Sequence, residues 1–89
     1  MNTILISYRL EQDTDEFQIK DRIKRHPNWA RIFNRLCIFK TITGVSSARY
    51  EFGYAIQGRG EVFVSNVTDT AWTSFNLDKE LSEWFNMNI

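Results

Sequence analysis

The most concentrated group of reactive side chains in this sequence is a cluster of lysines and arginines. Residues 20 to 49 hold eight lysines and arginines but only one acid, Asp21, although the 89-residue chain has a formal net charge of zero. Most of the carboxylates lie in two other segments, 11–16 and 69–83. Clustered cations attract phosphates. Two interpretations follow: the basic segment meets an anionic partner, or it pairs with the acidic segments inside the fold.

The sequence offers few residues that could bind a metal or act as a nucleophile. His26 is the only histidine and Cys37 the only cysteine, so the chain has no zinc-ligand spacing. The apolar surroundings of Cys37 favour a buried structural thiol, and the position of His26 favours a helix C-terminus. The glycines of "GRG", 58–60, precede a predicted strand, which indicates a turn rather than a phosphate-binding loop. We expect no catalytic residue, no metal and no cofactor.

Length and composition indicate one small globular domain, residues 1–89. Hydrophobic residues make up 43% and aromatic residues 15% of the chain, enough large apolar side chains for a core. No apolar run approaches the roughly 20 residues that span a bilayer. The first residues, "MNTILISYRL", lack the features of a signal peptide, and a lone cysteine fits a reducing compartment. We therefore expect a cytoplasmic protein without a membrane partner.

The first half of the chain alternates between strand and helix patterns. Residues 3–10 alternate in polarity with period two, which predicts a strand. Asp13 and Glu16 have the spacing of a capping box, so a helix is expected from there to about His26. Pro27 then disfavours helical backbone at the residue before it.

Residues 29–42 are rich in strand-forming residues and allow two interpretations. They can form one long strand or a hairpin that turns at Asn34-Arg35. We favour the hairpin because strands are commonly about 5–6 residues long, with Asn34 the residue suited to positive φ. A second helix is predicted over 46–57, capped by Ser46 or Ser47.

The last third predicts a strand, a short strand and a helix. The strands are "EVFVSNV", 61–67, and "TAWTSF", 70–75, and Asn76 is expected to cap the helix. The helix has an apolar stripe at helical spacing, formed by Leu77, Leu81, Trp84 and Phe85. The order β-α-β-β-α-β predicts an α+β, ferredoxin-like antiparallel sheet, followed by an extra short strand and a C-terminal helix.

Several segments, in this order, resemble a known family. They are "LISYRL", "IKDRIK", "CIFKT", "EVFVSNVT" with "TAW", and "LSEWF". The chain resembles, over nearly its whole length, the SinR family of small bacterial proteins. That family is similar in fold to the CRISPR-associated adaptation protein and to VapD-type ribonucleases. The resemblance implies a ferredoxin-like fold and a homodimer.

Arg9 departs from the pattern of the nuclease relatives. Those proteins typically end the first strand with a tyrosine and an aspartate, and that carboxylate can hold Mg²⁺. Here the pair is Tyr8-Arg9, and an arginine repels a cation. A metal-dependent nuclease, using Glu11 or Asp13, is therefore the least favoured interpretation.

The resemblance also implies a role for residues 70–75. Late strands in such proteins can pair with the sheet edge of a partner, which places Trp72 and Phe75 in a dimer interface. The alternative is that this segment folds back onto its own sheet.

Our first interpretation is a non-enzymatic homodimer that contacts DNA or RNA. Ferredoxin-like RNA-binding domains use the helix-free sheet face, where Arg9 and Arg31 could join Tyr8, Trp29 or Phe33, depending on register. The competing interpretation is that a second subunit or the C-terminal segment covers this face. The predicted phosphate contacts are Arg9, Lys20, Arg22, Lys24, Arg31 and Arg35. The alternative is a protein-interaction module, such as an immunity protein, an antitoxin or a phage-encoded inhibitor, that presents a charged face to a protein target.

Overall fold

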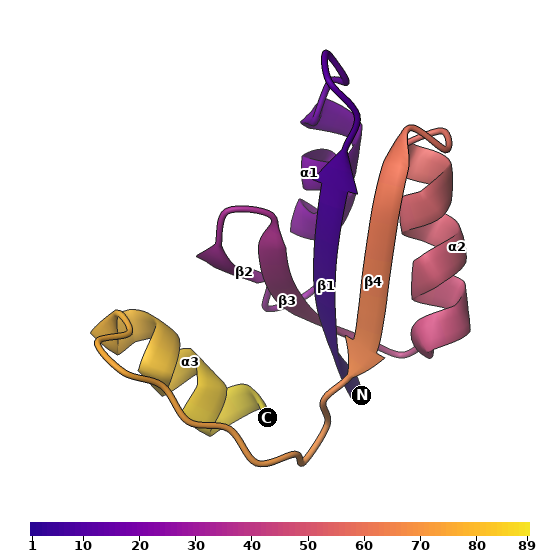
Figure 1. Ribbon diagram of the computed structural model, residues 1–89. Coiled ribbons are helices and arrows are strands. Elements are labelled where there is room, and N and C mark those ends of the chain that lie inside the picture. Colours follow the sequence, from indigo (N-terminus) through magenta and orange to yellow (C-terminus); the bar gives the residue numbers. More distant parts are fainter.

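The chain folds into a four-stranded antiparallel sheet with two helices on one face and a third helix on the other (Figure 1). The computed structural model describes all of residues 1–89. The elements are β1 (Asn2–Leu10), α1 (Phe17–Lys24), β2 (Ala30–Phe33), β3 (Leu36–Thr41), α2 (Val45–Ala55), β4 (Gly60–Asn66) and α3 (Lys79–Asn88). The strand order is β2-β3-β1-β4, and this connectivity is compatible with a ferredoxin-like arrangement. The predicted α+β class is confirmed.

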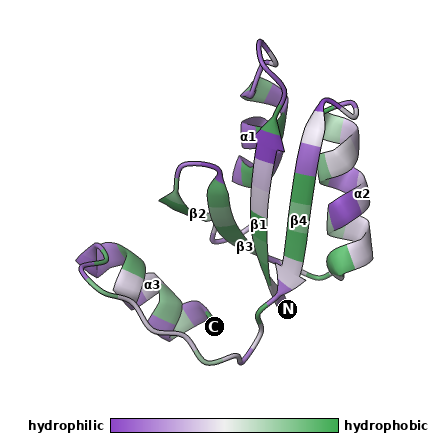
Figure 2. Ribbon diagram, viewed as in Figure 1, coloured by the Kyte–Doolittle hydropathy of each residue, from purple (hydrophilic) through white to green (hydrophobic).

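The main core lies between the sheet and helices α1 and α2. The even-numbered residues of β1 face these helices, as the polarity pattern predicted, and Ile4 and Ile6 are fully buried. Helix α1 contributes Ile19 and Ile23, which are one turn apart, and α2 contributes Phe52. Figure 2 shows the matching hydrophobic stretches in β1, β3 and β4.

Helix α3 is attached to the opposite face of the sheet. The Thr3 hydroxyl donates to the Asn88 carbonyl at 2.8 Å, and the Lys40 ammonium donates to the same carbonyl at 2.8 Å. This places a cation at the C-terminal end of a helix, where the free carbonyls carry partial negative charge. Ile38, only 1% exposed, lies outside the main core cluster. The opposite face of the sheet therefore has a buried residue of its own.

The start of helix α1 differs from the prediction. Asp13 has φ of +64° and lies in a turn, so it cannot cap the helix. Asp15 instead binds the first amide of the helix: its carboxylate accepts a hydrogen bond from the Phe17 amide at 2.9 Å. Glu16 occupies the cap position but makes no cap bond, since its side chain is held elsewhere.

The predicted caps of the other two helices are also wrong. Helix α2 begins after Gly44, with no side-chain cap, rather than at Ser46 or Ser47. Helix α3 begins after Asp78, whose carboxylate accepts from the Glu80 amide at 2.8 Å. Asn76 has φ of +58° and lies two residues too early, because the backbone turns there before the helix starts.

The hairpin interpretation of residues 29–42 is confirmed. Strands β2 and β3 pair antiparallel and turn at Asn34 and Arg35. The positive φ of +62° falls on Arg35 and not on Asn34. A long-range ion pair fixes the Arg35 side chain, which helps to hold this less favoured backbone conformation.

Residues 70–75 form no strand, so the predicted extra strand is wrong. The chain between β4 and α3 has no regular element, and Asp69 adopts positive φ of +57° at its start. Trp72 instead packs edge-on against Phe85 of α3, with ring centroids 4.8 Å apart. The segment thus contacts helix α3 of its own chain.

Two glycines give opposite predictions for stability. Gly60 has φ of +153°, and a Cβ there would collide with the carbonyl oxygen of Arg9. Gly53 lies inside α2 with no atom within 4 Å of the site of a Cβ. We expect Gly60→Ala to lower the free energy of unfolding by roughly 2–4 kcal/mol, and Gly53→Ala to raise it by about 1 kcal/mol.

Urea denaturation followed by circular dichroism measures both changes. The two variants carry the same added methyl group, so each is the control for the other. Shifts of the same sign would contradict this account of the two sites.

Candidate nucleic-acid interface

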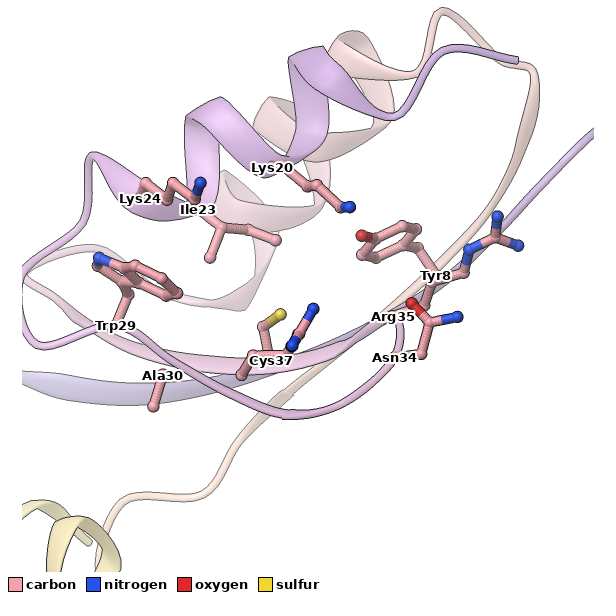
Figure 3. Close-up of a pocket in the computed structure, with 10 residues that line it drawn as sticks. Tyr8, Lys20, Ile23, Lys24, Trp29, Ala30, Asn34, Arg35 and Cys37 are labelled. Atoms are coloured by element: carbon pink, nitrogen blue, oxygen red, sulfur yellow. The ribbon is translucent and has the colours of Figure 1, made fainter. Parts of the chain in front are cut away.

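A groove of about 480 Å³ lies between α1 and the β2–β3 hairpin (Figure 3). Four cations line it: Lys20 and Lys24 from α1, and Arg31 and Arg35 from the hairpin. Tyr8, Ile23 and Cys37 line its inner part, and Trp29 stands at one end. We call this feature the basic groove.

Local structure explains why these cations converge. Lys20 and Lys24 are one helical turn apart and therefore share a face of α1. Arg31 pairs in register with Cys37, so both side chains point to the helix-covered side of the sheet. Arg35 joins them from the turn, where its positive φ redirects the chain.

Glu16 organises one end of the basic groove. One of its oxygens accepts from Arg35 Nε at 2.9 Å and from Arg35 Nη2 at 2.7 Å. The other accepts from the Tyr8 hydroxyl at 3.1 Å and lies 3.5 Å from Lys20 Nζ. One carboxylate thus fixes two of the four cations and the phenol.

The titration of this cluster follows from its contacts. Burial would raise the pKa of Glu16, but hydrogen bonds from Arg35 and Tyr8 and the charges of Arg35 and Lys20 outweigh it and hold the pKa below its ordinary value. Burial, followed by the Glu16 charge, raises the pKa of Tyr8. Tyr8 is therefore a hydrogen-bond donor at neutral pH, and not a nucleophile.

The other two cations of the groove carry uncompensated charge. Neither Lys24 nor Arg31 forms an ion pair, and Lys24 Nζ lies 5.8 Å from the centroid of the Trp29 ring. Four cations and one carboxylate leave a net charge of +3. Clustered positive charge of this kind attracts phosphate groups.

Cys37 is buried, as predicted for a structural thiol. Burial raises its pKa, against smaller opposing effects from Arg31 and Lys20. The thiol is therefore protonated at neutral pH and contributes packing rather than charge.

The structure brings together four of the six predicted phosphate contacts and separates the other two. Arg9 lies on the far face of the sheet, where its guanidinium pairs with the directly opposite Glu61 of β4, with 3.1 Å between Nε and Oε1. Arg22 turns toward α2 and lies 3.7 Å from Glu51. Neither side chain lines the basic groove.

The predicted binding surface on the helix-free face is wrong. Arg9 and Arg31 point to opposite faces of the sheet, and Tyr8 faces the helices. Helix α3 is bound to this face, which agrees with the competing interpretation that the C-terminal segment covers it. The register that decides these directions depends on pairing between distant strands, which the sequence pattern does not specify.

The interpretation that the basic segment pairs with acids inside the fold is confirmed in part. Of the eight cations in residues 20–49, four form ion pairs with Glu16, Asp21 or Glu51. No acid of residues 69–83 pairs with this segment, because the one ion pair there joins Lys79 to Glu83. Internal pairing therefore neutralises the outer side of α1 more than it does the basic groove.

His26 has a structural role at the edge of the hydrophobic core. Its ring stacks on Phe39 with centroids 4.1 Å apart, and its Nε2 lies 2.9 Å from a carboxylate oxygen of Glu51. The structure contains no group of three or more histidines, cysteines and acids that could hold a metal ion. Glu11 and Asp13 lie in the exposed turn after β1.

Sequence reasoning missed the role of Glu16, which it treated only as part of a cap. Its spacing from Lys20 was a signal for one ion pair, but Arg35 reaches it only through the fold.

Comparison of the chain with models of known families, with curated proteins and with solved structures finds no match. No helix here combines the length and apolar character needed to cross a membrane.

The lowered pKa of Glu16 predicts a pH-dependent stability. Its ionised form stabilises the fold above the ordinary glutamate pKa of about 4.3, and this contribution is lost as the pH falls through the lower folded-state pKa. We expect Glu16→Gln to reduce the free energy of unfolding by about 1–3 kcal/mol at pH 7. The difference from the wild type should shrink below pH 4.3 and disappear below the folded-state pKa.

Denaturation in urea at a series of pH values tests this prediction. Glu61→Gln is the control, because its ion pair is exposed and its loss should change stability less. A Glu16→Gln effect that stays constant down to low pH would show that the carboxylate charge is not responsible.

Proposed function

We propose that this protein is a non-enzymatic nucleic-acid-binding domain that holds phosphates in the basic groove. The observation that carries the proposal is the convergence of four cations from α1 and the hairpin on one groove with a single paired carboxylate. Arginine offers a planar fork of donors to phosphate oxygens, and lysine offers a mobile point charge. Lys24 and Arg31, which have no ion pair, are the foremost phosphate contacts, and Lys20 and Arg35 support them.

Such contacts attach the protein to the backbone without reading the sequence of bases. The affinity must then fall steeply as salt rises, because each neutralised phosphate releases counterions. A target in the cytoplasm is consistent with this role, and we place the protein there.

We also propose that the domain is a ferredoxin-like member of the SinR-like group and forms a homodimer. The strand order β2-β3-β1-β4 supports the first part. The side chain of Phe75 is 90% exposed and supports the second, since an exposed aromatic beside Trp72 favours burial in a partner. Two grooves in one dimer would raise the avidity for a long strand.

Charge reversal in the groove tests the binding function. We expect Arg31→Glu and Lys24→Glu each to weaken binding of a fluorescein-labelled oligonucleotide by roughly tenfold or more. Each should also reduce the slope of log affinity against log salt by about one. Fluorescence anisotropy over a series of salt concentrations measures both quantities.

Arg49→Glu is the matched control. Arg49 is exposed, forms no ion pair and lies near β4, at the other edge of the sheet from the hairpin. Equal losses in all three variants would mean that net charge alone governs binding, and no binding by the wild type at low salt would remove the proposal.

A protein target remains the second candidate. Tyr50 and Tyr54 are one turn apart on α2 and are 78% and 71% exposed, which favours a contact with another protein. In that case Tyr50→Ser with Tyr54→Ser would abolish partner binding, whereas the charge reversals in the groove would not.

A further inference from the structure

We infer that the basic groove selects single-stranded nucleic acid over duplex, by stacking one unpaired base on Trp29. This inference rests on the proposed function, because it names the form of nucleic acid that the same groove takes. The observation behind it is an aromatic ring that lies among phosphate-binding cations and outside the core.

Trp29 is placed as a binding residue rather than as a core residue. It precedes β2 and lines one end of the groove, and 42% of its surface is exposed. It is absent from the core cluster that joins the sheet to α1 and α2. Figure 3 shows its ring beside Lys24 and directed along the groove toward Cys37.

Cations line the same groove as this ring, and one of them, Lys24, lies over it. Lys24 Nζ lies 5.8 Å from the ring centroid, and Arg31 lines the same groove from the hairpin. A base stacked on Trp29 would therefore have cations within reach of its flanking phosphates. Proteins that bind single strands combine these two features, a positive groove for the backbone and an aromatic platform for bases.

A duplex cannot use this platform. Its bases stack on one another and expose only their edges, whereas the bases of a single strand are free to stack on aromatic side chains. The groove volume of about 480 Å³ also lies within the range of sites for small ligands, about 300–1,000 Å³, which suits a short piece of one strand. Every base has an aromatic face, so the selection acts on strandedness and not on base identity.

The test compares two single strands with one duplex. The probes are fluorescein-labelled dT12, its RNA counterpart rU12, and a mixed-sequence DNA duplex of 12 base pairs. We expect the wild type to bind both single strands more tightly than the duplex. Trp29→Leu should weaken single-strand binding by roughly tenfold and leave duplex binding unchanged.

Two further variants separate stacking from general disruption. Trp29→Phe keeps an aromatic face, so it should retain most of the single-strand affinity. Trp72→Leu is the control, because Trp72 packs on α3 at the other face of the sheet. The wild type should also lose tryptophan fluorescence on binding dT12, and Trp29→Phe should not.

The outcomes distinguish the two claims. Equal weakening of single-strand and duplex binding in Trp29→Leu, or an undiminished quench in Trp29→Phe, would overturn the stacking inference and leave the proposed function standing. Absence of binding to all three probes at low salt would overturn both. If Trp29→Leu does not fold, the affinity and the quench of Trp29→Phe decide the question.

Discussion

The fold around the groove depends on one partly buried carboxylate, that of Glu16. It contacts Tyr8, Lys20 and Arg35. It joins the turn before α1 to the end of β1 through Tyr8 and to the hairpin through Arg35. Because Arg35 has positive φ, this ion pair also helps to hold a turn that its sequence does not favour. The Glu16–Arg35 ion pair thus ties the hairpin to the start of α1, and the groove lies between these two elements. Against the effect of burial, hydrogen bonds from Arg35 and Tyr8 and the charges of Arg35 and Lys20 hold the pKa of Glu16 below its ordinary value.

The two faces of the sheet are built differently, and this decides where a ligand can bind. One face is covered by α1 and α2 over a continuous apolar core. The other is covered in part by α3, held by hydrogen bonds from Thr3 and Lys40 to the carbonyl of Asn88. Lys24 and Arg31, which form no ion pair, therefore lie at the edge of the sheet, between α1 and the short outermost strand β2, and not on the open sheet surface.

Local patterns in the sequence predicted most elements, because alternation and helical spacing are properties of neighbouring residues. The hairpin and the last helix are examples. The caps failed, since Asp13 and Asn76 adopt left-handed backbone conformations that the capping pattern does not reveal. The site was predicted in part: α1 periodicity places Lys20 and Lys24 together, but the direction of Arg9 depends on its pairing with β4.

The attachment of α3 has a consequence for the motion of the molecule. A segment without regular structure, residues 67–78, connects this helix to β4. The helix accepts its hydrogen bonds from the sheet at its last residue, Asn88. The helix can therefore open as a unit while the main core stays folded, at a lower free energy than global unfolding. Its amide hydrogens would then exchange with solvent sooner than those of β1, and each opening would bring the buried side chain of Ile38 into contact with water.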